Sequence, residues 1–499
     1  MSSMTQHLNK KKPSLGNWLK YHFLEKKLNT VFGFILLTLI GVCTAYATSI
    51  DLLIGLGMVV LFATILAIII FLKYPYAGFY IMICFSSIVI TLDRLIHLPF
   101  PFNVLLEPLT LLLFLGILRD YDLRKQVDRR FWTNPITIGQ YFLFAYYVIE
   151  LFNPAMFSTM GWLSFFRKQL SYFIFYYIAY SLLNTKARIF AFIYFMITLS
   201  TILALYACKQ QFFGYADFEL RSVGTGGGYI LLFQGGLLRK FSVFSDPATS
   251  GVCFSSIAML CIILWIRDPH KIRRRWLGIA IIINILGYSF SGTRTATIMI
   301  ASAIAFYAIA TAYEKTTITF LIVSILIFIT ILTMPYQNVV TNRIRSAFDG
   351  TKDASASLRD YNRHQIQPYL YKHPIGGGVF TVGAEGPKYN PGHVLVAFQP
   401  DSGYAKAMAE TGPVGLAILL IFYLIVMRQG IQNFYKAKDP QIQNLWIALL
   451  IMLFTLLVAQ YSQMAISQYP ILFYFYGALV VLIKLSDYDK EPNSENFQI

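Results

Sequence analysis

The stretches "VFGFILLTLIGVCTAYATSI" at residues 31–50 and "LLIGLGMVVLFATILAIIIFL" at residues 52–72 are almost continuously apolar. Each has about the 20 residues that an α-helix needs to cross the hydrocarbon core of a bilayer. A barrel strand would instead alternate apolar and polar residues over about 10 positions. The whole chain agrees, because 57% of its 499 residues are hydrophobic and only 13% are charged. The sequence therefore predicts an all-α, polytopic transmembrane helical bundle.

Similar apolar runs recur along the chain and predict about 14 membrane helices. We expect them at residues 31–49, 52–72, 75–92, 101–118, 135–152, 169–184, 187–207, 249–266, 276–290, 294–312, 317–334, 402–427, 443–460 and 468–485. The first eleven then occupy residues 31–334 and the last three occupy 402–485. The segments outside the helices are an N-terminal segment (1–30), an outer loop at about 208–248, a large extracytoplasmic loop (335–401) and a tail (486–499).

The basic residues indicate which side of the membrane each segment faces. The net charge is +17, and 25 of the 41 lysines and arginines lie in the segments on the same side as the two termini. Because short cytosolic loops carry an excess of Lys and Arg, we expect both termini in the cytosol. A basic rim facing anionic lipid explains most of the excess charge. We therefore expect membrane lipids, and no nucleic acid, as partners.

Two other patterns are interpreted as structural. The cysteines lie in or beside apolar runs without CxxC spacing, so we expect small core residues and neither metal ligands nor disulfides; they are Cys43, Cys84, Cys208, Cys253 and Cys261. The glycine clusters "GTGGG" (224–228) and "HPIGGG" (373–378) lack the strand, loop and helix context of a nucleotide site. We interpret them as tight turns and expect no bound cofactor.

The stretch "SGTRTATIMIASA" (291–303) sets Arg294 at the outer, N-terminal end of an apolar helix. Free backbone N–H groups and the helix dipole favour an anion there, and a guanidinium adds to this. A lone arginine at such a place more often reaches lipid headgroups. Here, however, further cations are expected on the outer face, at Arg167, Lys168, Arg239, Lys240, Arg359 and Arg363. Several converging arginines would suit a diphosphate, although Arg363 is interpreted as a solvated loop charge.

About the last 260 residues carry four features in a fixed order. These are the helix starts "SDPATSG" (245–251) and "SGTRTA" (291–296), an arginine about 15 residues ahead of the "HPIGGG" turn, and "DSGYAKAMAETGPVG" (401–415). The pattern resembles the O-antigen ligase and oligosaccharide repeat-unit polymerase superfamily. The resemblance implies a polytopic glycosyltransferase that acts on undecaprenyl-diphosphate-linked sugars.

Family ligases show His-Asn, nine residues, Gly, two residues and Gly at the last of these motifs. This chain keeps the spacing, with Asp401, Ser402, Gly412 and Gly415 at the four positions. Aspartate in place of histidine favours a polymerase-like or other exopolysaccharide member. The resemblance further implies that Arg239, Arg294 and Arg359 bind the diphosphate, and that Asp401 orients or deprotonates the acceptor hydroxyl.

The residue Asp401 has two interpretations, which stay open together. A base is needed near the incoming hydroxyl, and Asp401 lies where the long loop enters a helix. Aspartate is also a common N-cap at such a place. Lys406 and Glu410 share a helix face four residues apart and are expected to form a structural pair. His393 is the reserve candidate for the base, and supporting roles are considered for Arg167, Lys168, His393 and Glu410.

The main functional hypothesis is a metal-independent glycosyltransferase. It would move a glycan from undecaprenyl diphosphate to a sugar hydroxyl on the outer side of the membrane, in O-antigen or exopolysaccharide polymerisation or ligation. The acceptor would be another lipid-linked repeat unit, lipid A core or a protein. The alternative is a polytopic transporter or flippase for lipid-linked saccharides, for which internal repeats and paired broken helices are typical. A structural or sensory membrane protein would tolerate replacement of the outer arginines.

Overall fold

The computed structural model describes residues 21, 30–96, 101–224, 232–234, 237–333, 345 and 354–489. The chain forms two compact units, which we describe separately. The first comprises Met1–Met82 and Pro108–Arg124, and the second comprises Ile83–Glu107 and Lys125–Ile499.

The first unit is built from apolar helices. It contains α2 (Val31–Ile50), α3 (Leu52–Lys73), the beginning of α4 (Pro75–Leu95), most of α5 (Leu106–Arg119) and nearly all of α6 (Tyr121–Lys125). A methyl group at Gly116 of α5 would lie 2.4 Å from the backbone oxygen of Phe71 in α3. Small residues allow helices in a membrane to approach this closely, so Gly116 sets the packing of α5 against α3.

The second unit holds the remaining elements. It starts with the C-terminal part of α4, followed by the 3-10 turn η2 (Phe102–Leu105) and the first two residues of α5. Its first half continues with α7 (Arg129–Thr133), α8 (Pro135–Ile149), η3 (Glu150–Phe152), α9 (Thr159–Leu182), α10 (Lys186–Phe212), α11 (Asp217–Val223) and the antiparallel pair β1 (Phe233–Gln234) and β2 (Leu237–Leu238). Its second half contains α13 (Pro247–Arg267), α14 (Lys271–Ser291), α15 (Arg294–Ala310), α16 (Lys315–Thr333), α18 (Ala354–Lys372), η5 (Gly383–Glu385), α19 (Gly386–Tyr389), η6 (Val394–Ala397), α20 (Gly403–Lys436), α21 (Pro440–Ala459), η7 (Ala465–Ser467) and α22 (Ile471–Tyr488).

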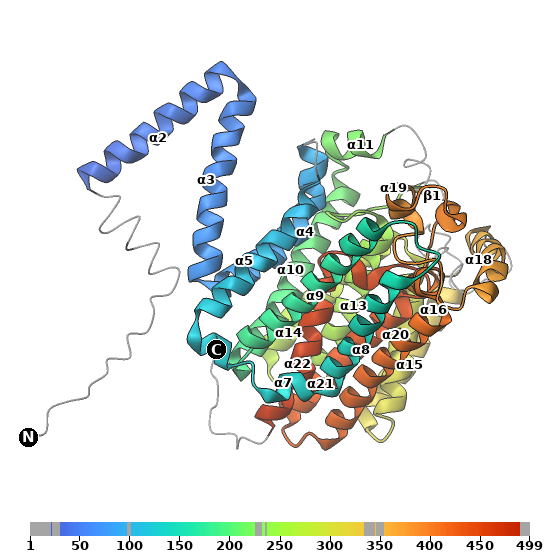
Figure 1. Cartoon of the computed structure of the whole chain (residues 1–499). Helices are drawn as coiled ribbons and strands as arrows, with labels where there is room; N and C mark the ends of the chain where they lie inside the picture. Colours follow the sequence, from blue (N-terminus) through green and yellow to red (C-terminus); the bar gives the residue numbers. More distant parts are fainter. Residues whose placement is uncertain are drawn as a thin grey trace, which may run out of the picture. The chain divides into compact units, whose positions relative to one another are not determined.

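The core of the second unit lies around α13, α21 and α22. Helix α13 packs against α10, α14, α15 and α21, and α21 also contacts α20 and α22 (Figure 1). Every residue of α21 from Leu445 to Leu453 is buried, since neighbours cover this helix on several sides. Helix α22 packs on α9, and α20 packs on α8.

Three of these helices begin with the same local device. A capping Asn or Asp precedes a proline at the first helical position, in Asn134–Pro135, Asp246–Pro247 and Asp439–Pro440. Each capping side chain accepts a hydrogen bond from a backbone N–H of the first turn. Proline fits because it lacks the N–H that would have no partner there.

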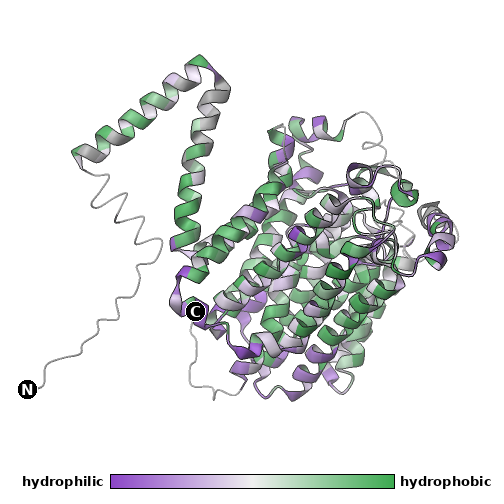
Figure 2. Cartoon of the chain, viewed as in Figure 1, coloured by the Kyte–Doolittle hydropathy of each residue, from purple (hydrophilic) through white to green (hydrophobic). Residues whose placement is uncertain are grey.

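The all-α, polytopic fold that the sequence predicts is confirmed. Among the described residues, nine helices are long and apolar enough to cross a membrane, and three more apolar helices are shorter. Every expected membrane segment overlaps a helix of the structure, although the expected number of crossings stays a prediction. Figure 2 shows hydrophobic residues along the lengths of the helices and hydrophilic residues gathered near helix ends and connecting turns.

Three local expectations differ from the structure. Helix α9 begins at Thr159, ten residues before the expected start at 169, because Ser158 caps it by accepting from the Gly161 N–H. The region expected to be a large extracytoplasmic loop contains a helix, α18, whose apolar side chains Ile366 and Leu370 pack into a small core. The helix expected at 402–427 is bent at Gly412 and continues to Lys436.

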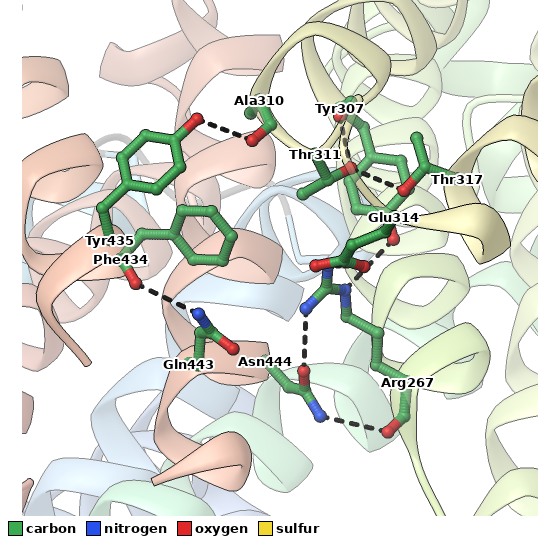
Figure 3. Close-up of polar contacts among 10 residues, drawn as sticks. All are labelled: Arg267, Tyr307, Ala310, Thr311, Glu314, Thr317, Phe434, Tyr435, Gln443 and Asn444. Carbon is green, nitrogen blue, oxygen red and sulfur yellow. Dashed lines mark hydrogen bonds and ion pairs between the residues drawn. The ribbon is translucent and has the colours of Figure 1, made fainter. Parts of the chain in front are cut away.

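A polar network joins four helices at one end of the second unit (Figure 3). The guanidinium of Arg267, at the end of α13, donates to Tyr307 Oη (3.1 Å), to Asn444 Oδ1 (3.1 Å) and to the Glu314 carboxylate. Asn444 Nδ2 returns a hydrogen bond to the Arg267 carbonyl at 3.0 Å. Nearby, Tyr435 of α20 donates to the Ala310 carbonyl at 2.7 Å. We call this arrangement the Arg267 network; it ties α13, α15, α20 and α21 together.

The Arg267 network predicts a large loss of stability when its charge pair is broken. Replacing Arg267 by Gln leaves the carboxylate of Glu314 in a site that is only partly open to water, with side-chain exposures of 9% for Arg267 and 24% for Glu314. We expect the free energy of unfolding to fall by about 2 kcal/mol, somewhat less than for a fully buried pair. Denaturant or thermal unfolding of the purified protein in detergent measures the effect.

A matched control is the exposed pair of Arg130 and Asp487, whose side chains are 68% and 32% exposed. Because water screens such pairs, Arg130→Gln should change the free energy of unfolding by about 0.5 kcal/mol or less. Equal effects of the two substitutions would contradict a stabilising role of the Arg267 network.

Candidate functional site

Two of the expected arginines are found at the start of α15. Arg294 is the first residue of this helix, and Arg239 reaches it from the segment before α13. The Arg239 Nε donates to the Ser291 carbonyl at 2.9 Å, and its Nη2 donates to Thr293 Oγ1 at 3.1 Å. Thr293 is the N-cap residue, but within the described structure its hydroxyl does not cap the helix. The start of α15 therefore combines the positive end of a helix with the Arg239 guanidinium and with an arginine as its first residue.

The starts of α13 and α15 are joined by a short hydrogen bond. Thr293 Oγ1 donates to the Pro247 carbonyl at 2.8 Å. The helices approach so closely that a methyl group at Gly251 would lie 2.5 Å from Ser291 Oγ and 2.7 Å from Thr293 Cβ. The two helix starts "SDPATSG" and "SGTRTA" therefore form one structural element, with Gly251 as the residue that permits their contact.

A buried network holds the segment that carries Arg239. Gln210 Oε1 accepts from the Ser242 N–H at 2.8 Å, and Gln210 Nε2 donates to the Ser242 carbonyl at 3.0 Å. The same Nε2 donates to Glu219 Oε1 at 2.6 Å, and Glu219 is 1% exposed. Ser242 has a φ of +55°, which is costly for a residue with a side chain. The network stabilises this strained turn and so fixes where Arg239 lies.

Two further cations flank this segment through aromatic rings. Tyr215 stacks on Phe241 with ring centroids 5.2 Å apart. Lys240 Nζ lies 4.6 Å from the Tyr215 ring, and the Arg94 guanidinium lies 4.2 Å from the Phe241 ring. Arg94 also donates to the Ser245 carbonyl at 2.9 Å. Burial lowers the pKa of Lys240. No residue pattern in the sequence indicates that Arg94, at the end of α4, lies here.

The glycine turn and the bend of α20 are locked together. Pro413 has no N–H and Gly412 has a φ of +66°, so the α-helical hydrogen bonds of the preceding turn are interrupted. The carbonyls of Ala409 and Glu410 accept instead from the N–H groups of residues 377 and 378, at 2.9 and 2.8 Å. The carbonyl of Thr411 accepts from Tyr146 Oη at 2.8 Å. We call this arrangement the glycine lock.

A turn of four residues after α21, Gln460–Gln463, connects the motif segments of the site. The Gln460 carbonyl accepts from Ser402 Oγ and from the Gly403 N–H, both at 2.9 Å. Ser462 Oγ lies 2.6 Å from Thr295 Oγ1, which follows Arg294 in α15. We call residues 460–463 the hub turn. These residues match none of the sequence motifs described above, so the hub turn was not predicted from the sequence.

The hub turn also anchors α18. Arg363 donates from Nη1 to Tyr461 Oη at 3.1 Å and from Nη2 to the Tyr461 carbonyl at 3.2 Å. Its guanidinium lies over the Tyr461 ring, 4.8 Å from the centroid. The interpretation of Arg363 as a solvated loop charge is therefore wrong, because the side chain is held against the hub turn. Arg359 precedes it by one helical turn in α18, but its side chain lies outside the described residues.

Asp401 lies directly before α20 and is half-buried. The N-cap of this helix is Ser402, whose Oγ accepts from the Ala405 N–H at 3.2 Å. Ser402 in turn bonds to the hub turn, so Asp401 lies next to the residue that joins α20 to Gln460. The capping role considered for Asp401 therefore belongs to Ser402.

His393 is held by hydrogen bonds on both ring nitrogens. Nδ1 accepts from the Leu395 N–H at 3.1 Å, and Nε2 lies 3.3 Å from Tyr369 Oη. Burial lowers the pKa of His393, which favours the neutral ring. A neutral imidazole has one lone pair for accepting a proton, and here the Leu395 N–H occupies it. His393 therefore shapes the loop, and we do not retain it as a candidate base.

The remaining residues considered in supporting roles have local partners. Arg167 Nε lies 2.8 Å from Glu107 Oε2, and both Arg167 and Lys168 belong to α9 instead of to a loop. Lys406 Nζ lies 3.8 Å from Glu410 Oε1, as expected for a structural pair. Glu410 is 3% exposed and lies beside the glycine lock.

The fold and the site thus define a polytopic membrane protein with arginines gathered at a helix start and with its motif segments joined by the hub turn and the glycine lock. Residues 279–420 match the family model described as O-Antigen ligase. This segment runs from α14 into α20 and includes Arg294, Arg359 and Asp401. The match confirms the resemblance to the O-antigen ligase and polymerase superfamily and supports a membrane enzyme of this type. No curated protein matches the chain.

The glycine lock predicts unequal effects of alanine at two glycines that both have positive φ. At Gly376 (φ +76°) an added methyl would lie 2.5 Å from the Glu410 carbonyl oxygen. At Gly392 (φ +83°) it would meet nothing within 4 Å. Gly392→Ala should lower the free energy of unfolding by about 1 kcal/mol through backbone strain alone. Gly376→Ala should lower it by at least about 2 kcal/mol and reduce activity, because the lock must open.

Thermal unfolding in detergent and product formation in membranes measure these two effects. If Gly376→Ala lowered stability and activity no more than Gly392→Ala, the close contact between the turn and α20 would not stabilise the protein.

Proposed function

We propose that this protein is a membrane glycosyltransferase that transfers a glycan from an undecaprenyl-diphosphate donor to a sugar hydroxyl. The contact of Arg239 with Ser291 and Thr293, beside Arg294, carries the proposal. It brings cations from segments far apart in the sequence to the positive end of one helix. A diphosphate is the anion that such a site would hold best.

The chemistry needs charge stabilisation more than any other contribution. In the transfer, the bond between the anomeric carbon and the diphosphate oxygen breaks, and the acceptor oxygen forms a bond to that carbon. Negative charge then develops on the departing diphosphate, where preorganised guanidinium groups lower the barrier. We assign this role to Arg239, Arg294 and Arg359. The reaction would proceed without a metal or cofactor.

The acceptor hydroxyl must lose its proton as it attacks. We propose that Asp401 accepts this proton or orients the hydroxyl. Support comes from its place beside Ser402, which bonds to the hub turn, while Thr295 next to Arg294 bonds to the same turn. The two proposed halves of the site are thus linked through four consecutive residues.

The biological setting follows from this chemistry. We propose that the site faces the outer side of a bacterial inner membrane, with both termini in the cytosol, and that the enzyme serves polymerisation or ligation of surface polysaccharide. The acceptor would be a second lipid-linked repeat unit in a polymerase, or lipid A core in a ligase. The aspartate at position 401 favours polymerisation.

The alternative, a transporter or flippase for lipid-linked saccharides, needs the helix bundle to open at each end in turn. Helices α13, α15, α20 and α21 carry polar ties at both ends. At one end Thr295 and Ser402 are tied to the hub turn, and at the other the Arg267 network joins all four helices (Figure 3). Polar contacts at both ends oppose the alternate opening that a transporter needs, so they favour a fixed catalytic site.

The central functional prediction concerns the arginines. Arg294→Ala and Arg359→Ala should each lower product formation at least about 100-fold, because each removes charge that stabilises the leaving diphosphate. The measurement is polymer or ligated glycan formed by the purified, reconstituted protein from a prenyl-diphosphate oligosaccharide.

Arg221→Ala serves as the control. Arg221 is exposed on α11, where its Nε bonds only weakly to the Asp217 carbonyl at 3.4 Å. This variant should keep wild-type activity, and all three variants should reach the membrane at normal abundance. Full activity of Arg294→Ala would remove the proposed mechanism.

A separate prediction addresses Asp401. Asp401→Asn keeps the size of the side chain but replaces one accepting carboxylate oxygen by an NH2 group, which donates and cannot take up the proton. We expect kcat to fall at least about 100-fold with little change in thermal stability. Ser402→Ala is the contrasting variant, because it removes the helix cap and should lower stability by about 1 kcal/mol. Equal losses of stability in both variants, without a loss of kcat in Asp401→Asn, would assign Asp401 a structural role only.

A further inference from the structure

The hub turn carries one aromatic residue between the two contacts that link it to the halves of the proposed site. Tyr461 lies between Gln460, which bonds to Ser402, and Ser462, which bonds to Thr295. Ser402 directly follows Asp401, and Thr295 directly follows Arg294. A sugar whose hydroxyl points to Asp401, while the donor diphosphate is held at Arg294, would lie close to this ring.

The Tyr461 ring is both exposed and fixed in orientation. Its side chain is 63% exposed. The Arg363 guanidinium covers one ring face at 4.8 Å and bonds to the hydroxyl and the carbonyl of the same residue. These contacts restrict rotation of the side chain and leave the second ring face without this cover. A fixed, open aromatic face suits the apolar C–H side of a pyranose ring, because little conformational entropy is lost when the sugar binds.

We propose that Tyr461 is the platform on which the ring of the acceptor sugar stacks, and that Arg363 is the positioning residue that holds this platform. This inference rests on the proposed glycosyl transfer and names the acceptor subsite within it. The proposal also gives α18 a second role at the site, beside the proposed binding of the diphosphate by Arg359. The helix positions Arg363 against the hub turn.

A neutral explanation is that Tyr461 only anchors the turn at the membrane surface, where tyrosine is common. The two explanations differ in what they require from the side chain. Stacking requires an aromatic ring and acts on acceptor binding, whereas a surface anchor acts on stability and insertion. Replacements that keep or remove the ring therefore separate them.

The kinetic experiment uses the full-length protein in proteoliposomes. The prenyl-diphosphate donor is saturating and has its non-reducing end blocked so that it cannot act as acceptor, and the acceptor is varied. Tyr461→Leu should raise the acceptor KM at least tenfold, with kcat and the donor KM within about twofold of wild type. Tyr461→Phe and Tyr461→Trp should keep the acceptor KM within about threefold. Tyr371→Leu, which changes an 83% exposed tyrosine of α18, is the control and should behave as wild type.

An unchanged acceptor KM in Tyr461→Leu would overturn the proposal, and so would a Tyr461→Phe variant as impaired as Tyr461→Leu. If Arg294→Ala retained activity, the proposed transfer itself would fail. If Arg294→Ala were inactive while Tyr461→Leu had a wild-type acceptor KM, only the acceptor subsite would fail.

A binding measurement covers the case in which Tyr461→Leu does not fold. We would place 3-fluorotyrosine at position 461 and, as a control, at position 371, and record ¹⁹F spectra of the protein in detergent without donor. Two probes are titrated separately: the oligosaccharide released by mild acid from the lipid-linked repeat unit, and the oligosaccharide of delipidated lipid A core. A shift at 461 alone with either probe supports the platform and identifies the acceptor class. No shift with either probe overturns it.

Discussion

The backbone of α20 imposes the constraint on which the rest of the site depends. A carbonyl left without a partner inside a membrane costs several kcal/mol by general estimates, roughly as much as a whole tertiary contact supplies. The bend at Gly412 and Pro413 redirects three such carbonyls. Two are satisfied by the glycine turn of the long loop and one by Tyr146 of α8. The loop therefore folds onto the bundle because the helix requires its N–H groups.

This constraint explains how a long loop contributes fixed residues to a site. The glycine lock sets residues 374–378 against α20, and the small core around Ile366 and Leu370 continues the attachment into α18. Arg363 then completes it at the hub turn. Each step uses a different interaction, namely backbone hydrogen bonds, apolar packing and a guanidinium over a ring. Together they bring a segment distant in sequence to the starts of α15 and α20.

The sequence predicted those features that depend on local composition. Apolar runs of membrane length located the helices, and the helix start at 294 indicated Arg294 as an anion-binding residue. Arg239 was indicated only by the family resemblance, and the structure places its guanidinium at the same helix start. Features that depend on distant partners were not predictable. Helix α18 is too polar to resemble a membrane span. It also has too few apolar residues to be predicted as an independently stable helix. The hub turn bonds through a backbone carbonyl and a serine, groups that no residue pattern distinguishes. The sequence could not distinguish Ser402 from Asp401 as the N-cap of α20, because Asp and Ser are equally good N-cap residues.

The glycine lock also has a consequence for how such proteins diverge. Its two halves are separated in the chain by some thirty residues, yet each supplies what the other lacks: free carbonyls on the bent helix and free N–H groups on the turn. A lineage that straightened the helix by losing Pro413 would leave the turn without acceptors. One that lost the glycines at positive φ would lose the turn conformation that presents the N–H groups to the bend. The two motifs are therefore expected to change together or not at all, as a single inherited unit, although separate parts of the chain encode them.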